Sequence, residues 1–199
     1  MTAYAAVVLA GGAARRMGGR DKPAVPVGGR PMRERVLAAV SDAVPRVLVG
    51  PADGVPADVL VTREDPPGGG PVAAVAAGLA LLPTGTTIVA LLAADLPLLT
   101  RDAVGVLLRA LSSERADGVC LVDGDGRRQP LCGVWRVPPL RAALGRLAAR
   151  RDGTLDGASM RELLGELTVG ELAWSASGPP PWFDCDTDSD VRRAEEWTR

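Results

Sequence analysis

The amino terminus places a short apolar run directly before a long glycine-rich loop. Residues 3–9 read AYAAVVL, and residues 10–22 carry four glycines, three arginines and a lysine. An uncharged run with paired valines, bounded by glycine, is typical of a strand buried on both faces. Such strands occur almost only in sheets that helices cover on both sides. The pattern therefore favours a parallel sheet between two layers of helices.

Strand patterns and helical patterns alternate along the rest of the chain, which implies a mostly parallel sheet with helices on both faces. We therefore predict a three-layer, Rossmann-like α/β fold in a single domain, residues 1–199. The predicted strands are residues 46–49, 59–62, 88–92, 118–122 and 131–137, the last two forming a hairpin-style excursion, and the predicted helices fall within residues 31–44, 72–82, 100–111, 140–149, 160–167 and 187–197.

The composition excludes several classes of protein. With 199 residues, 47% of them apolar, the chain can bury the core of one ordinary domain. The net charge of −1 gives no general attraction to nucleic acid or to an anionic membrane. The chain has no histidine, which excludes Ser-His and Cys-His catalysis, and its three scattered cysteines suit a reducing compartment. Because no spanning segment or signal peptide is evident, we expect a cytoplasmic protein.

The loop of residues 10–22 has the composition of a phosphate-binding loop. Glycines let backbone amides approach phosphate oxygens closely and tolerate positive φ. Arg15, Arg16 and Lys22 add cationic donors that suit a triphosphate. A dinucleotide-binding loop and a P-loop are excluded, because the spacing is not GxGxxG and no GKS or GKT follows the glycines. A solvated surface loop is the remaining alternative.

A carboxylate, Asp95, lies just beyond the strand predicted at residues 88–92 and before Leu96 and Pro97. Ligands of parallel sheets bind beyond the carboxyl ends of the strands, where the glycine-rich loop is also expected. Mg²⁺ prefers hard oxygen ligands and needs only one or two carboxylates when phosphates and water complete its shell. Asp95 is therefore a candidate Mg²⁺ ligand, with an ordinary helix-entry aspartate as the alternative.

The motifs and their order resemble those of the molybdenum cofactor guanylyltransferase family. The first motif, LAGGAARRMGGRDK at residues 9–22, is the most specific. The others are weak singly and gain weight from their order over nearly the whole chain. They are ED at residues 64–65 before GPVAA at 70–74, AADLPLL at 93–99, QPL at 129–131 and FDCDT at 183–187.

This resemblance implies a fold of the nucleotide-diphospho-sugar transferase type. The implied reaction transfers GMP from GTP to molybdopterin and releases pyrophosphate. Mg²⁺ is the implied cofactor, with Mn²⁺ as a substitute. Residues 1–100 would form the nucleotide half and residues 101–199 the acceptor half. GTP and molybdopterin are the implied partners, together with transient contact to proteins that handle the cofactor, and neither nucleic acid nor membrane is expected.

The resemblance also implies roles for individual residues. Lys22, Arg16 and Asp95 would be catalytic, and Asp95 would bind the metal. The acceptor would contact Gln129, Asp184 and Asp186, although the two aspartates could complete the metal site instead. For these three and for Asp65, ordinary roles in turns or at strand ends stay open. The implied nucleotide-binding residues are Leu9, Ala10, Gly11, Gly12, Arg16, Lys22, Asp65 and Asp95.

One position departs from the family, and three alternatives stay open. Gly50 stands where the family commonly carries asparagine, so one side-chain contact would be absent. A related enzyme could use CTP, although cytidylyl enzymes typically read LAAG where this chain reads LAGG. A sugar or polyol phosphate could be the acceptor instead. A catalytically silent nucleotide-binding regulator is the third alternative, and the intact Lys22 and Asp95 argue against it.

Overall fold

A computed structural model describes residues 2–11, 22–175 and 178–198. The strands of its main sheet are β1 (Ala5–Leu9), β4 (Arg46–Val49), β5 (Val59–Thr62), β6 (Ile88–Ala93), β7 (Gly118–Val122), β8 (Arg128–Arg136) and β9 (Val169–Ala173). They lie in the order β5-β4-β1-β6-β8-β7-β9, and only β8 runs antiparallel to its neighbours. The prediction of a mostly parallel sheet is confirmed.

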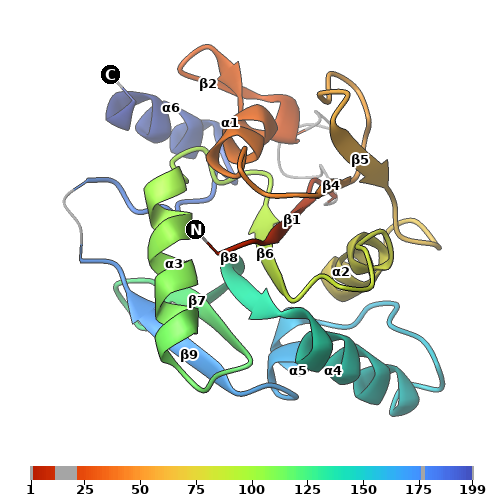
Figure 1. Cartoon of the computed structure of the whole chain (residues 1–199). Coiled ribbons are helices and arrows are strands. Elements are labelled where there is room, and N and C mark those ends of the chain that lie inside the picture. Colours follow the sequence, from red (N-terminus) through yellow and green to blue (C-terminus); the bar gives the residue numbers. More distant parts are fainter. Residues whose placement is uncertain (1, 12–21, 176–177, 199) are drawn as a thin grey trace.

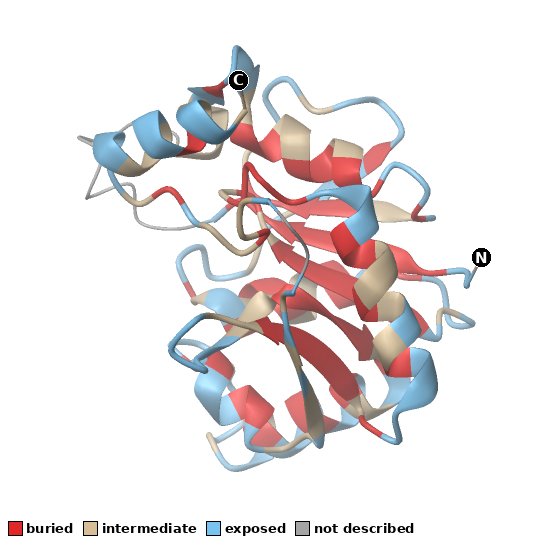
Figure 2. Ribbon diagram, turned by 90° about the vertical axis from the view of Figure 1, so that its left-hand side faces the viewer, coloured by how far each residue is buried: buried red, intermediate tan, exposed pale blue. Residues whose placement is uncertain are grey.

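Helices cover both faces of this sheet (Figure 1). Successive side chains of a strand point to opposite faces, so Val7 and Val8 of β1 enter different cores although both are fully buried. The core around Val7 is closed by α2 (Pro71–Ala80), α4 (Val137–Ala149) and α5 (Met160–Leu164). The core around Val8 is closed by α1 (Met32–Ala39) and α3 (Arg101–Ser113). Figure 2 shows the central strands buried between the two layers, so the three-layer prediction is confirmed.

The segment that begins at Lys22 packs against the last helix, beside the main layers. The 3-10 helix η2 (Lys22–Ala24) leads into the small ribbon of β2 (Pro26–Val27) and β3 (Arg30–Pro31), and α6 (Asp188–Trp197) packs against β2. Cys185 and Ala194 join Val27 in a third, small core. This contact brings residues near Lys22 beside the last predicted motif.

The reversed strand β8 brings its amino end to the sheet edge where the parallel strands have their carboxyl ends. Leu92, near the end of β6, pairs with Cys132 of β8. The motif at residues 129–131 therefore lies at that edge. The predicted pairing of β7 with β8 is confirmed, but the two strands are part of the main sheet and not an excursion from it, because β8 also pairs with β6 and β7 with β9.

The helix predicted within residues 31–44 is shorter in the structure. It ends at Ala39, and Val44 lies beyond it with 80% of its surface exposed. Pro45 explains why Val44 is not helical, because a proline disfavours helical backbone at the residue before it. Among the described helices, none has both the length and the apolar character needed to cross a membrane.

Candidate active site

Backbone hydrogen bonds continue past the ends of three parallel strands. The amide of Ala10 donates to the carbonyl of Val49 over 2.8 Å, and the amide of Ala94 donates to the carbonyl of Leu9 over 2.9 Å. These bonds hold the start of the glycine-rich loop beside the segment that carries Asp95. The two segments that the sequence singled out therefore meet at one edge of the sheet, as expected for parallel strands.

Two adjoining hollows open at this edge. One has a volume of about 590 Å³ and the other about 480 Å³, both within the range of small-molecule sites. Asp95 lines both hollows and so lies at their boundary. The first hollow, here called the nucleotide hollow, is lined by Leu9, Gly11, Glu64 and Gly68 among others. The second, here called the acceptor hollow, is lined by Gln129, Ser159, Trp182 and Asp184 among others.

Lys22 contacts two carboxylates from distant parts of the chain. Its Nζ lies 2.5 Å from Oδ2 of Asp95 and 2.6 Å from Oδ1 of Asp186. Partial burial lowers the pKa of Lys22, but the hydrogen bonds to Asp186 and Asp95 outweigh burial and leave the pKa above its ordinary value. The side chain is therefore a fixed positive charge beside the boundary of the hollows.

The motif at residues 183–187 folds back over the end of β6. The amide of Cys185 donates to the carbonyl of Asp95 over 3.3 Å, and the Cys185 side chain is fully buried in the small core under α6. Burial raises the pKa of this thiol to about 12, so it is a packing group and not a nucleophile. Its two neighbours reach the site instead: Asp184 lines the acceptor hollow and Asp186 contacts Lys22.

The site holds more negative than positive charge among the described residues named so far. Burial, and then the charges of Asp186 and Asp95, raise the pKa of Asp184. No group of three or more described His, Cys, Asp or Glu side chains is arranged to enclose a metal ion. Hard oxygen donors with excess negative charge nevertheless fit a Mg²⁺ that brings phosphates and water with it, because such an ion needs only one or two carboxylates.

The sequence of this chain matches a known family model over most of its length. The model of the MobA-like NTP transferase domain matches residues 6–168. This range includes the strand ends that line the two hollows. The chain belongs to this family. It is therefore a nucleotidyltransferase, and the family resemblance predicted from its motifs is confirmed.

Curated relatives of this MobA-like chain carry the name molybdenum cofactor guanylyltransferase. The protein of Bradyrhizobium sp. (strain ORS 278) is 31% identical, over 98% of this chain and 92% of the relative. That of Rhizobium johnstonii is 33% identical, over 97% and 92% of the two chains. Both alignments cover nearly the whole length of each protein.

Solved structures support the fold. The molybdopterin-guanine dinucleotide biosynthesis protein A of Archaeoglobus fulgidus superposes with a TM-score of 0.72 at 20% identity, covering 96% of each chain. The 2-C-methyl-D-erythritol 4-phosphate cytidylyltransferase of Thermus thermophilus gives 0.70 at 21% identity, covering 98% of each chain. The prediction of a nucleotide-diphospho-sugar transferase type of fold is confirmed.

Gly50, where the resemblance implies asparagine, packs closely against the start of the glycine-rich loop. Gly50 has a φ of +150°, and a Cβ placed there would lie 2.9 Å from the Cβ of Ala10 and 3.0 Å from its carbonyl carbon. An asparagine side chain cannot fit without moving the start of the glycine-rich loop. The start of the loop and the end of β4 therefore approach each other more closely than a larger residue at position 50 would allow.

The structure does not bring every predicted residue to the two hollows. Asp65 lines a separate hollow beside Ala73 and Ala77 of α2. Its neighbour Glu64 lines the nucleotide hollow, where Oε1 accepts a hydrogen bond from the amide of Gly68 over 3.1 Å. The sequence motif led to a predicted nucleotide contact for Asp65 and to none for Glu64. The role of Asp65 stays a prediction.

Several other predicted residues lie at or beside the two hollows. Leu9 and Gly11 line the nucleotide hollow, and Ala10 is buried between them. Gln129 lines the acceptor hollow and donates a 3.1 Å hydrogen bond to Oδ2 of Asp123, which fixes its amide. Gly12 and Arg16 lie outside the described residues, so their roles also stay predictions.

Proposed function

We propose that this chain transfers GMP from GTP to molybdopterin and releases pyrophosphate. The observation that carries the proposal is the position of Asp95 at the boundary of two adjoining hollows, where Lys22 contacts both Asp95 and Asp186. A group-transfer enzyme needs a donor site and an acceptor site that meet at one reacting atom. The name of the relatives, molybdenum cofactor guanylyltransferase, supports GTP as the donor and molybdopterin as the acceptor.

The nucleotide hollow suits the GTP donor. Its lining comes from the ends of β1 and β6 and from the segment of residues 64–71, nearly all within the first half of the chain. Gly11 leaves room for a purine close to the backbone, and Lys22 supplies positive charge for the triphosphate. Residues 1–100 therefore serve as the nucleotide half in this proposal.

The acceptor hollow suits a flat heterocycle with a phosphate. Trp182 and Met160 give it apolar surface, and Gln129, Ser159 and Asp184 give it hydrogen-bonding groups. Aromatic side chains stack on planar rings, and a few polar groups then fix the orientation of the ring. Most of this lining lies within residues 129–184, which supports residues 101–199 as the acceptor half.

The proposed step forms one phosphorus–oxygen bond and breaks another. A phosphate oxygen of the acceptor attacks the α-phosphorus of GTP, and the bond from that phosphorus to the oxygen bridging to the β-phosphate breaks. Pyrophosphate leaves with the bonding electron pair. The chain contributes position and charge, because Lys22 stabilises negative charge that develops on the phosphate oxygens. Arg16 adds to that charge in the same proposal.

Asp95, with Asp186 as a second carboxylate, would hold the Mg²⁺. The ion, for which Mn²⁺ can substitute, supplies charge neutralisation at the phosphates when it is bound. A cytoplasmic location and transient contact with proteins that handle the cofactor belong to the same proposal.

Acceptor-dependent pyrophosphate release tests the function. The chain is incubated with GTP and Mg²⁺, with and without molybdopterin, and pyrophosphate is measured together with the mass of the product. We expect pyrophosphate only when both substrates are present, and a product that equals molybdopterin plus GMP. Release that does not depend on molybdopterin, or that requires a sugar or polyol phosphate, contradicts the proposal.

A further inference from the structure

The wall of the acceptor hollow includes a loop without regular secondary structure. Residues 151–159, here called the wall loop, connect α4 with α5, and Gly157 and Ser159 line the acceptor hollow. Asp152 and Gly153 both have positive φ, at 53° and 85°. Positive φ costs glycine nothing, but a non-glycine residue such as Asp152 keeps it only where surrounding contacts hold the backbone.

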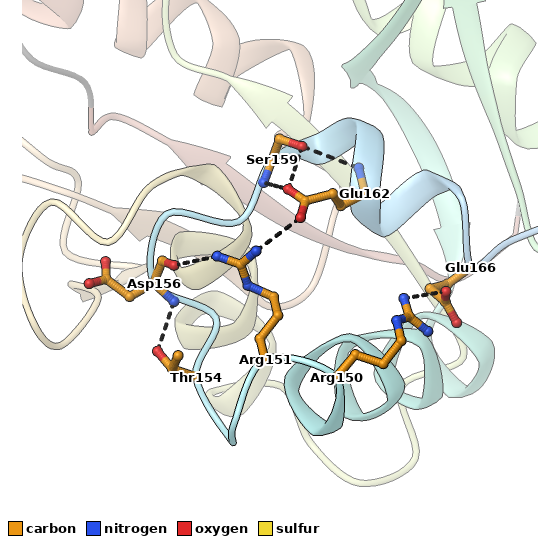
Figure 3. Close-up of polar contacts among 7 residues, drawn as sticks. All are labelled: Arg150, Arg151, Thr154, Asp156, Ser159, Glu162 and Glu166. Atoms are coloured by element: carbon orange, nitrogen blue, oxygen red, sulfur yellow. Dashed lines mark hydrogen bonds and ion pairs between the residues drawn. The ribbon is translucent and has the colours of Figure 1, made fainter.

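Arg151 holds the wall loop from its first residue. Nη2 of Arg151 donates to the carbonyl of Asp156 over 2.9 Å, and Nη1 donates to Oε1 of Glu162 over 2.9 Å (Figure 3). Glu162 in turn accepts hydrogen bonds of 2.7 Å from the amide and the hydroxyl of Ser159. One guanidinium therefore ties the middle of the loop and, through Glu162, its end.

The wall loop also contacts the nucleotide side of the site. The amide of Gly157 donates to the carbonyl of Gly69 over 2.8 Å. A Cβ at Gly69 would lie only 3.1 Å from Oδ1 of Asp156, so the two segments pass each other closely. The next residue, Gly70, lines both hollows. The position of the wall loop is thus linked to the boundary where transfer occurs.

We propose that Arg151 is a positioning residue that sets the shape of the acceptor hollow through the wall loop. Arg151 lies outside the described residues that line the two hollows, so its removal takes away no contact with substrate. Its effect is on Gly157 and Ser159, which do line the acceptor hollow. This inference rests on the proposed function only in naming the acceptor as molybdopterin.

The neighbouring residue provides a matched control. Nη2 of Arg150 donates to Oε1 of Glu166 over 2.5 Å and points away from the wall loop (Figure 3). Arg150→Ala removes the same charge from the adjacent position, and Glu166 keeps its hydrogen bonds with Arg146. Arg151→Lys keeps the positive charge but loses the planar guanidinium that donates to Asp156 and Glu162 at once.

Steady-state kinetics separate positioning from a purely structural role. In Arg151→Ala we expect the KM for molybdopterin to rise about 10-fold with kcat within about 2-fold, because a misplaced wall weakens acceptor binding. Arg150→Ala should match the wild type, and Arg151→Lys should fall between the two. If Arg151→Ala has the KM of Arg150→Ala, or if only its melting temperature or its kcat changes, the inference is overturned.

Amide hydrogen exchange provides a readout that needs no acceptor. Faster exchange of residues 152–159 is expected in Arg151→Ala and not in Arg150→Ala, because the loop loses its tie to Arg151. Unchanged exchange in Arg151→Ala overturns the inference even if the wild-type chain uses molybdopterin. Conversely, a wild-type chain that does not use molybdopterin contradicts the proposed function, and the exchange result still decides the role of Arg151.

Discussion

Lys22 and Asp95 lie 73 positions apart in the sequence, and the Nζ of Lys22 lies 2.5 Å from Oδ2 of Asp95. The contact joins the end of the glycine-rich loop to the end of β6. It places a positive charge and a metal-binding candidate at the boundary of the nucleotide and acceptor hollows. The two side chains have different proposed tasks, so substitutions at each should fail in different ways.

Lys22→Ala should reduce turnover by about 10²-fold or more and leave the fold intact. The expected loss is that of one group stabilising charge at the transferred phosphate. Pyrophosphate release measures turnover, and circular dichroism with thermal melting checks the fold. A normal rate in the folded variant removes Lys22 from the mechanism.

Chemical modification gives an independent check, because Lys22 is the only lysine in the chain. An amine-selective acylating reagent can modify only this side chain and the terminal amine. Loss of activity should follow the modification of Lys22 as located by mass spectrometry. Full activity after complete modification of Lys22 contradicts the proposed role.

Asp95→Asn should raise the Mg²⁺ concentration needed for half-maximal rate and lower the rate itself. Removal of the carboxylate charge weakens a hard-cation site without a change in side-chain volume. Asp184→Asn and Asp186→Asn should be milder, because Asp184 lines the acceptor hollow and Asp186 is only the second carboxylate of the proposed metal site. Asp186→Ala should harm acceptor turnover more than GTP binding. Titration of Mg²⁺ and measurement of GTP affinity for the four variants test this division, and a normal Mg²⁺ requirement in Asp95→Asn contradicts it.

Glu64 and Asp65 can be separated by matched substitutions. Glu64 lines the nucleotide hollow and Asp65 lines a different one. Glu64→Gln should therefore raise the KM for GTP more than Asp65→Asn, by about 10-fold if one charge-assisted hydrogen bond is lost. If Asp65→Asn has the larger effect, the assignment made from the sequence motif stands and that made from the hollow is wrong.

Two helix glycines should respond to alanine in opposite directions. A Cβ at Gly78 of α2 would lie 2.4 Å from Cγ1 of Val7, whereas nothing lies within 4 Å of a Cβ at Gly145 of α4. Gly78→Ala should lower the free energy of unfolding by about 1–2 kcal/mol, because overpacking outweighs the gain in helix propensity. Gly145→Ala should raise it by roughly 0.5–1 kcal/mol. Denaturant unfolding of both variants measures the difference, and a stabilised Gly78→Ala contradicts the packing of α2 on β1.

The hydrogen bond from Tyr4 to Asp42 should stabilise the fold in a pH-dependent way. Burial raises the pKa of Asp42, but the 2.7 Å hydrogen bond from the Tyr4 hydroxyl and the nearby Arg101 outweigh it and lower the pKa. A carboxyl with a lowered pKa in the folded state adds stability above its unfolded pKa and loses it as pH falls. Tyr4→Phe should therefore cost about 1 kcal/mol at pH 7. The cost should shrink below pH 3.8, the ordinary pKa of aspartate, and an equal cost at pH 7 and pH 3 contradicts this account.

Local pattern predicted most of the regular structure. The strands predicted at residues 46–49 and 59–62 have the same bounds in the structure, and Thr100 and Thr187 cap α3 and α6 as predicted. Strand β9 was not predicted, because Glu171 and Ala173 are exposed and no continuous apolar run marks it. Patterns that span only a few residues, such as a continuous apolar run or a helix N-cap with its partner three residues away, can be recognised without knowledge of the fold.

The candidate site was only partly predictable, because its contacts join distant segments. Lys22 and Asp186 are separated by 164 positions, and no local pattern relates them. They meet because α6 packs against β2 through the small core around Cys185. Likewise, the sequence motif marks residues 64–65 but cannot say which of the two carboxylates faces the nucleotide hollow, since that depends on how the chain turns after β5.

A competition between nucleoside triphosphates tests whether this chain transfers GMP. Equal concentrations of GTP, ATP and CTP are incubated with the chain, Mg²⁺ and molybdopterin, and the dinucleotide products are separated by mass. We expect the guanine dinucleotide as the main product, less of the adenine product and least of the cytosine product. A cytosine dinucleotide as the main product would contradict this expectation.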